Sequence, residues 1–382
     1  MKNQKYSFLF IVIFSIIFSS CREKKAINTN ENITKQLSEV KYAKGFDIER
    51  FNDYKKVIIK TPYPEAKESL IYILKSKSQS KKSELNKGDI QVPVDKIVVT
   101  STTHIPMLEL LGEENSLVGF QDTNYISSEK TRKRIDSGFV RELGKEAAMN
   151  TEVLFELQPD LVVGFAMNKT NKTYNLIEKQ GIPVIINGDW LEETPLGRAE
   201  WIKFFGALYD KEKEADSIFK LIESNYLEAK AIAKKSNNKP TILSGAIMRN
   251  DIWNLPGGES FVAKFLLDAN VNYLWKDSKG KGSLQLSFES VFDKAQDADY
   301  WIAPGYFSTK EQMLENNSHY KSFTAFQQGN IYTAATKIGA TGGVIYYELA
   351  PTRPDLVLRD IIKITNPSLL LNYELTFFEK MK

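Results

Sequence analysis

The sequence has a single cysteine and only two histidines among 382 residues. One cysteine excludes an internal disulfide, and two histidines leave few imidazole ligands for a zinc or manganese site. The 51 basic and 48 acidic residues nearly balance, so the composition gives no indication of nucleic-acid binding. The apolar run from Phe8 to Phe18 is far shorter than the roughly 20 residues that a membrane-spanning helix needs.

A basic start, this short apolar run and two serines precede the cysteine at position 21, which is the plan of a secretory signal. The arrangement resembles the lipobox of bacterial lipoproteins, in which the cysteine is lipidated. We therefore expect residues 1–20 to be a signal peptide, Cys21 to carry the lipid, and residues 21–40 to be a polar tether. The chain would then be exported and periplasmic, and lipid-anchored to a bacterial membrane. An ordinary signal followed by a chance cysteine is the alternative.

Short runs of β-branched and aromatic residues occupy 55–60, 69–75 and 89–101, with turn-forming residues between them. They predict a β-rich extension over residues 41–95. The continuous apolar run in "KIVVTS" is typical of a parallel strand buried on both faces.

After the extension, helical and strand patterns alternate. Residues 150–165 and 173–188 each read as a helix followed by a strand, which indicates an α/β domain with a parallel sheet. Residues 195–210 predict one helix and residues 211–236 a second, whose length would be on the order of 39 Å. The alternation restarts at residue 239.

We therefore predict an α/β fold of two Rossmann-like lobes with parallel sheets, joined by one long backbone helix, with a ligand cleft between the lobes. The predicted boundaries are 96–195 for the first lobe, 196–238 for the helical linker and 239–382 for the second lobe with its closing helix. In open parallel sheets a ligand binds beyond the carboxyl ends of the strands.

Two segments of the same design carry a resemblance to a known family: "NTEVLFELQPDLVVG" (150–164) and "SFESVFDKAQDADYWIAPG" (287–305). Each has a glutamate near the start of a helix, then a polar turn and a strand. With the long helix between them, they resemble the substrate-binding protein of a type II ABC importer, over roughly residues 95–366. The resemblance implies that Glu152 and Glu289 dock onto a permease dimer in the inner membrane. A helix-start role, which the helix dipole favours, is the alternative for both.

The resemblance also implies a cargo: a ferric siderophore first, with haem or cobalamin as alternatives bound by the same mechanism. The loops beyond the predicted strands supply aromatic residues and a few cations, which suit a large, flat or anionic complex. For any single aromatic residue, core packing is the alternative. The candidate ligand-binding residues are Thr102, His104, Tyr125, Phe165, Trp190, Arg249, Trp253, Tyr306, Tyr346 and Arg353.

Two other classes of function stay open. A zinc- or manganese-binding protein of similar fold would need several converging ligands, and the sequence offers only His104 and His319 as imidazoles. A hydrolase would carry a nucleophile motif, and none of the G-x-S-x-G, P-loop or H-E-x-x-H patterns occurs. We expect no catalysis, no cofactor, no resident metal and no nucleic-acid partner, and we expect a monomer.

Overall fold

The structure is a computed structural model that describes residues 36–37, 40–78, 85–145 and 148–382. The predicted signal peptide, Cys21 and most of the tether lie outside the described residues. No helix within these ranges is both long and apolar enough to span a bilayer.

A five-stranded sheet in the order β1-β2-β3-β4-β5, antiparallel except for the β4–β5 pair, has four of its strands in the predicted extension and β1 in the segment predicted as the polar tether. Its inner face is formed by alternate residues such as Phe46, Ile48 and Val57, which are buried. The predicted β runs are confirmed as strands, and β1 and β2 are additions that the sequence analysis missed. The strands are β1 (Gln36–Leu37), β2 (Phe46–Arg50), β3 (Tyr54–Ile59), β4 (Leu70–Ser76) and β5 (Ile90–Val92).

The first lobe is built on a parallel sheet in the order β10-β9-β6-β7-β8. Every residue of β6, β9 and β10 is buried, which is why these strands appear in the sequence as continuous apolar runs. Side-chain caps at Ser128, Asn150 and Asn171 fix where three of the helices begin. The strands are β6 (Ile97–Val99), β7 (Leu117–Phe120), β8 (Arg141–Glu142), β9 (Leu161–Gly164) and β10 (Val184–Ile186), and the helices are α1 (His104–Leu110), α2 (Glu129–Asp136), α3 (Thr151–Leu157) and α4 (Lys172–Lys179).

The second lobe is built on the sheet β14-β11-β16-β17-β18, which is parallel except for the antiparallel β18 at its edge. A small antiparallel sheet, β12-β13-β15, which the sequence analysis did not predict, accompanies it. The strands are β11 (Thr241–Ser244), β12 (Ala246–Ile247), β13 (Ile252–Pro256), β14 (Asn272–Tyr273), β15 (Ser283–Ser287), β16 (Tyr300–Ile302), β17 (Ile331–Thr333) and β18 (Glu379–Lys380). The helices are α8 (Phe261–Asp268), α9 (Phe288–Ala295), α10 (Lys310–Asn316), α11 (Thr324–Gln327), α12 (Ile345–Leu349) and α13 (Pro354–Thr365).

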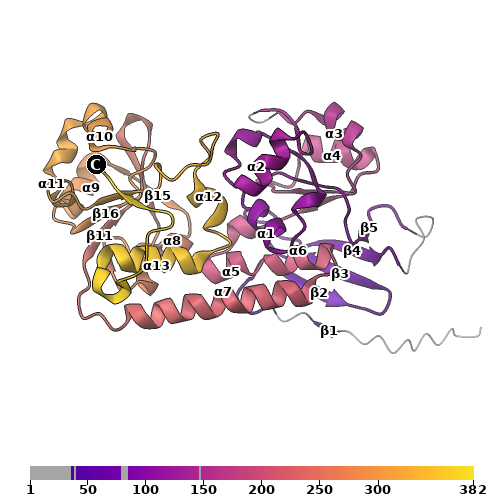
Figure 1. Cartoon of the computed structure of the whole chain (residues 1–382), viewed down its shortest axis with the longest axis horizontal. Coiled ribbons are helices and arrows are strands. Elements are labelled where there is room, and N and C mark those ends of the chain that lie inside the picture. Colours follow the sequence, from indigo (N-terminus) through magenta and orange to yellow (C-terminus); the bar gives the residue numbers. More distant parts are fainter. Residues whose placement is uncertain (1–35, 38–39, 79–84, 146–147) are drawn as a thin grey trace, which may run out of the picture. The chain divides into compact units, whose positions relative to one another are not determined.

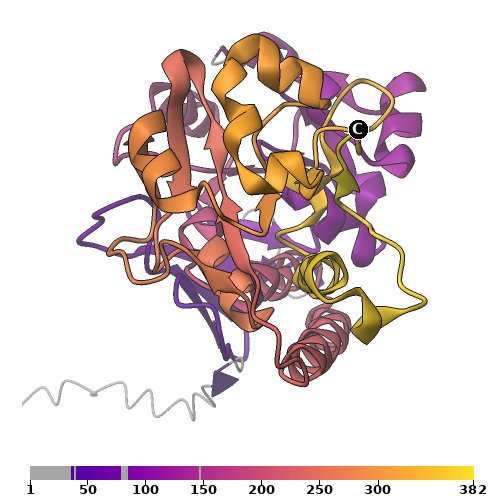
Figure 2. The same cartoon turned by 90° about the vertical axis from the view of Figure 1, so that its left-hand side faces the viewer.

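The linker contains α5 (Pro195–Ala199), α6 (Ile202–Leu208) and the 22-residue helix α7 (Glu212–Ala233). Helix α7 packs against α6 at one end and against α13 of the second lobe at the other (Figures 1 and 2). At roughly 1.5 Å per residue it is about 33 Å long. The long connecting helix is therefore confirmed, together with the α/β fold and its parallel sheets.

The single helix predicted over 195–210 is wrong, because the chain tightens at Glu200 and Trp201 and separates α5 from α6. Backbone bonds there span three residues, as in a 3₁₀ turn: Trp201 bonds to Arg198 and Lys203 to Glu200. The tightening coincides with a contact that no local pattern shows. The fully buried Glu200 carboxylate accepts hydrogen bonds from the backbone N–H groups of residues 41–43 at 2.6–3.1 Å.

Candidate ligand-binding site

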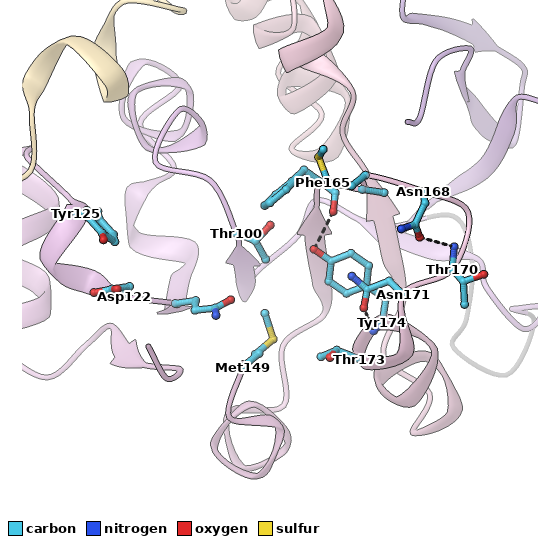
Figure 3. Close-up of a pocket in the computed structure, with 13 residues that line it drawn as sticks. Thr100, Asp122, Tyr125, Met149, Phe165, Asn168, Thr170, Asn171, Thr173 and Tyr174 are labelled. Atoms are coloured by element: carbon cyan, nitrogen blue, oxygen red, sulfur yellow. Dashed lines mark hydrogen bonds between the residues drawn. The ribbon is translucent and has the colours of Figure 1, made fainter. Parts of the chain in front are cut away.

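A cavity of about 430 Å³ opens beyond the carboxyl ends of strands in the first lobe (Figure 3). Thr100 lies just beyond β6, Gln121 follows β7 and Phe165 follows β9, so three neighbouring strands contribute to it. This is the edge of the sheet at which α/β proteins bind ligands. The lining residues are Thr100, Gln121, Asp122, Tyr125, Met149, Phe165, Ala166, Met167, Asn168, Thr170, Asn171, Thr173 and Tyr174.

The backbone at the end of β9 is held by Tyr174 of α4. The Tyr174 hydroxyl donates a hydrogen bond to the Phe165 carbonyl at 3.2 Å, visible as a dashed line in Figure 3. A Cβ atom on Gly164 would lie 2.5 Å from the Tyr174 ring, so only glycine allows this close approach. The position of Phe165 is thus fixed by contacts of its backbone, which leaves its ring available to the cavity.

A second cavity of about 220 Å³, the inner cavity, shares Phe165 and Met167 with the first. It is lined by Ser101, Thr103, Phe165, Met167, Asp189, Trp190, Arg198 and Pro351. Pro351 follows α12, so this cavity has one wall from the second lobe.

Large apolar side chains that line the larger cavity are exposed, and two of them, Phe165 and Met167, also line the inner cavity. Phe165 is 42% exposed, Met167 61% and Tyr125 64%. An exposed cluster of this kind, beside a cavity, is typical of a binding surface, because burying it against a ligand is favourable. Three predicted residues, Tyr125, Phe165 and Trp190, therefore line cavities. Thr102 is half-buried between the lining residues Ser101 and Thr103, without lining a cavity itself.

His104 does not face the cavities, which corrects the prediction for this residue. It is fully buried at the start of α1, with its ring 5.3 Å from that of Phe205. Burial lowers the pKa of its imidazole, although the nearby Asp189 carboxylate, 3.9 Å from Nε2, opposes this shift. A ligand in the inner cavity would meet Asp189 and not His104.

Trp253 is also a core residue, and the prediction that it contacts the ligand is wrong. Its side chain is fully buried, stacked on Trp301 with ring centroids 5.1 Å apart. Its indole N–H donates to the Asp251 carboxylate at 2.9 Å. Antiparallel pairing of β13 with β15 places Trp253 on the inner side of the small sheet, opposite Leu286.

The other predicted residues of the second lobe do not line a described cavity. Arg249 is exposed, and Tyr306 is 70% exposed with its ring 6.0 Å from that of Tyr347. The Tyr346 ring packs against Phe377 and Phe378 in the core. Arg353 forms a two-pronged ion pair with Asp355 at 2.8 and 2.9 Å, which occupies its guanidinium.

Sequence reasoning missed Arg198, which lies on α5 and lines the inner cavity. Its guanidinium lies 3.6 Å from the centroid of the Phe261 ring and donates to the carbonyl of Trp190 at 2.7 Å. Burial lowers the pKa of this group. Nothing in the helical pattern around it distinguishes Arg198 from a solvent-exposed arginine.

The glycine-rich segment 337–343 of the second lobe contacts the first lobe beside the larger cavity. A Cβ atom on Gly343 would lie 2.3 Å from the Tyr125 carbonyl oxygen, so the two backbones are in direct contact. Thr341 donates to the carbonyl of Asn124 at 2.8 Å. The buried Glu348 of α12 accepts hydrogen bonds from the N–H groups of Ser127 and Ser128, at 2.6 and 3.0 Å. Tyr125 is thus positioned by contacts from the second lobe.

The two predicted docking residues are exposed, and each lies in the first turn of a helix. Glu152 follows the Asn150 cap of α3, and Glu289 follows the Ser287 cap of α9. Hydrogen bonds from its own backbone N–H and from the Ser287 hydroxyl lower the pKa of Glu289. Both carboxylates are therefore accessible to a partner, and their docking role stays a prediction.

Metal-binding geometry is absent from the part of the chain that the structure describes: no three His, Cys, Asp or Glu side chains converge there. His319 lies beside the Phe288 ring of the second lobe, and His104 is buried in the first. The described residues therefore offer no support for the bare-metal alternative.

A family model described as "Periplasmic binding protein" matches residues 97–338. The chain belongs to this family. The match spans both α/β sheets and the helix between them, as far as the glycine-rich segment. The resemblance that the paired helix–strand segments suggested is confirmed at the level of the family.

Among curated proteins, the chain is 26% identical to an uncharacterized lipoprotein of Methanocaldococcus jannaschii, over 97% of this chain and 94% of the relative. Among solved structures, a periplasmic heme binding protein from Pseudomonas aeruginosa has a TM-score of 0.58 at 16% identity, over 76% of this chain and 98% of that one. An ABC-type Fe3+-hydroxamate transport protein from Saccharomonospora viridis has a TM-score of 0.50 at 17% identity, over 63% of this chain and 84% of that one. These structures are alike in fold.

Proposed function

We propose that the protein is the substrate-binding component of an ABC importer, and that it captures an iron complex, a ferric siderophore in the first place, and delivers it to the permease. The observation that carries the proposal is the exposed group Tyr125, Phe165 and Met167 at the carboxyl edge of the first sheet. Such a group has no role in the core, but it can cover the apolar part of a large ligand.

The size and character of the cavities support an organic cargo. At about 430 Å³, the larger cavity falls within the usual range for small-molecule sites, roughly 300–1,000 Å³. Its lining combines aromatic and thioether groups with the amides of Asn168, Asn171 and Gln121. Apolar surface with a few polar groups is what fixes the orientation of a large organic molecule.

Haem is the second candidate, because the aromatic and thioether surface suits a flat macrocycle and because a fold neighbour is named as a heme binding protein. Cobalamin would be bound by the same surface. In each case the protein binds and releases its cargo unchanged, and no catalytic step is proposed.

Two further parts of the proposal concern the membrane. We propose that Cys21 carries the lipid anchor, as the name of a curated relative as a lipoprotein also suggests. Two or more acyl chains would hold the protein stably at the bacterial membrane. Glu152 and Glu289, one from each lobe, would pair with basic groups of the permease and set its orientation.

The test is a calorimetric titration of the chain from residue 22 onwards with ferric hydroxamate, ferric catecholate, ferric citrate, haem and cobalamin. We expect saturable binding of at least one ferric complex or haem, with the cargo recovered intact after release. If cobalamin were the only ligand that binds, the cargo would be a corrinoid and not an iron complex. The absence of binding by every member would contradict the proposal.

A further inference from the structure

The inner cavity contains one basic and one acidic side chain that do not pair with each other. Arg198 and Asp189 both line it, and within the described ranges neither forms an ion pair with an opposite charge closer than the 3.9 Å contact of Asp189 with His104. The Asp189 carboxylate nevertheless raises the pKa of Arg198 against the lowering effect of burial.

Arg198 is held in place by uncharged groups. It donates to the carbonyls of Trp190 and Glu192, at 2.7 and 3.4 Å, and its guanidinium lies over the Phe261 ring, 3.6 Å from the centroid. Carbonyl oxygens and an aromatic face orient the guanidinium without neutralising it. A fixed guanidinium loses little freedom when it binds a further acceptor.

One hydrogen-bond donor of a residue that lines the same cavity has no acceptor. The indole N–H of Trp190, a lining residue, is buried without a hydrogen-bond partner. Buried polar groups are nearly always paired, with protein, water or ligand. The unpaired indole N–H is therefore a donor that an acceptor group of a ligand in the inner cavity can satisfy.

We propose that the inner cavity binds an uncharged amide group of the cargo, whose carbonyl oxygen accepts from Arg198 and Trp190 while its N–H donates to Asp189. A carboxylate would satisfy the donors but would be repelled by Asp189, and an ammonium group would be repelled by Arg198. An amide carries one acceptor and one donor without net charge, so it satisfies both sides.

The role of this subsite rests on the proposed function, because the inner cavity would bind one arm of the cargo. The cavity holds about 220 Å³, enough for an arm of a large ligand, whereas the body would lie in the larger cavity on the other side of Phe165 and Met167. Amide groups with a free carbonyl and N–H occur both in the backbones that link the iron-binding groups of hydroxamate ligands and in the carboxamide side chains of corrinoids. The chemistry is shared, and the test must separate the two sources.

The subsite itself can be tested without the natural cargo, with acetamide and acetate, which have the same size and differ in charge. The chain has five tryptophans, so its ¹⁵N spectrum has few indole signals, and Trp190→Phe identifies the one from Trp190. At pH 7.5 we expect acetamide to shift that signal saturably, at concentrations about tenfold lower than acetate. Asp189→Asn should remove the repulsion and bring the acetate midpoint close to that of acetamide.

Arg198→Met should abolish the shift with both probes, and Arg141→Gln, which changes an exposed arginine outside the cavities, should leave both titrations unchanged. The unperturbed backbone signals of each variant establish that it is folded. Tighter binding of acetate than of acetamide by the wild type, equal binding of the two, or no saturable shift would overturn the proposal.

Titrations of wild type and Arg198→Met with ferric hydroxamate and with cobalamin then distinguish the sources. The ligand whose affinity falls about tenfold in the variant is the one whose amide enters the inner cavity. Full affinity of the variant for a ligand that binds the wild type would show that the cargo does not use this subsite. If neither ligand binds the wild type while acetamide does, the proposed function fails and the amide subsite stands.

Discussion

The two lobes both place aromatic residues near the ends of their strands, but they use them in opposite ways. In the first lobe, Phe165 and Tyr125 are 42% and 64% exposed and line a cavity. In the second lobe, Trp253, Trp301 and Tyr320 are fully buried and in ring contact with one another. The same residue types thus line a cavity in the first lobe and form a core in this part of the second lobe, where Tyr306 is nevertheless exposed.

The difference arises from what covers each strand end. The small sheet β12-β13-β15 and the segment around Tyr320 enclose the aromatic group of the second lobe. The segment after β9 has no such cover, because Phe165 leads directly into the loop that borders the larger cavity. An aromatic residue after a strand is therefore a candidate for ligand contact only where no further element packs over it.

The largest expected effect separates the two lobes by stability. Trp253→Ala should lower the free energy of unfolding by about 3–5 kcal/mol, because it leaves a cavity inside an aromatic core. Phe165→Ala should change it by less than about 1 kcal/mol, since the ring is already in contact with solvent. Urea unfolding followed by circular dichroism measures both. Equal losses in the two variants would remove the distinction between the lobes.

The next effect concerns Glu348, through which the second lobe contacts the first. Burial raises the pKa of this carboxyl to about 7, and the nearby Glu109 carboxylate adds to the rise. A raised carboxyl pKa means that the folded state binds the proton more tightly, so the stabilisation is complete below about pH 4.5 and is lost as the pH rises through 7. The loss amounts to about 3 kcal/mol of unfolding free energy.

Glu348→Gln cannot ionise, so this part of the pH dependence should be missing from the variant. We measure the difference in unfolding free energy between the wild type and the variant. This difference should fall by about 3 kcal/mol between pH 4.5 and pH 8. Glu156→Gln, which changes an exposed glutamate, serves as the control. A difference between wild type and Glu348→Gln that stays constant over this range would contradict the assignment.

A smaller effect is expected on cargo binding. Phe165→Ala should weaken the affinity for the bound iron complex about tenfold, because it removes one exposed ring from the contact surface. Phe139→Ala removes a ring that is 64% exposed and lies outside the described cavities, so it should bind like the wild type. Calorimetric titration of the three proteins measures this. An equal loss in both variants would mean that the ring at Phe165 has no specific role.

The smallest effect on stability is expected for the docking residues. Glu152→Lys and Glu289→Lys together should change the unfolding free energy by about 1 kcal/mol at most and leave cargo affinity unchanged, because both side chains are exposed. Uptake of the cargo by cells that carry the permease should nevertheless be lost. Unimpaired uptake would leave the two glutamates as helix-start residues only.

Much of the fold could be predicted from the sequence because it depends on local patterns. Strands such as Ile97–Val99 are runs of buried β-branched residues, and helices begin at caps such as Asn150 and Ser287. The break between α5 and α6 could not be predicted, because Glu200 is bonded to residues 41–43, far away in the sequence.

The candidate site divides in the same way. Tyr125, Phe165 and Trp190 could be predicted, because they follow strands and the carboxyl ends of parallel strands define the binding edge. Trp253 met a similar criterion and is core, since the pairing of β13 with β15 cannot be read from composition. Arg198 could not be found, because its role follows from its contact with Phe261 across the fold.

The most direct test of the binding surface is anomalous diffraction at the iron edge, from crystals grown with the ferric complex that binds most tightly. The account predicts one strong iron peak beside Phe165 and Tyr125, with Trp253 still packed on Trp301. An iron peak in the adjoining cavity, on the side bordered by Tyr72 and Glu178, or a cargo in contact with Trp253, would contradict the assignment of the surface around Phe165 and Tyr125 as the cargo-binding surface.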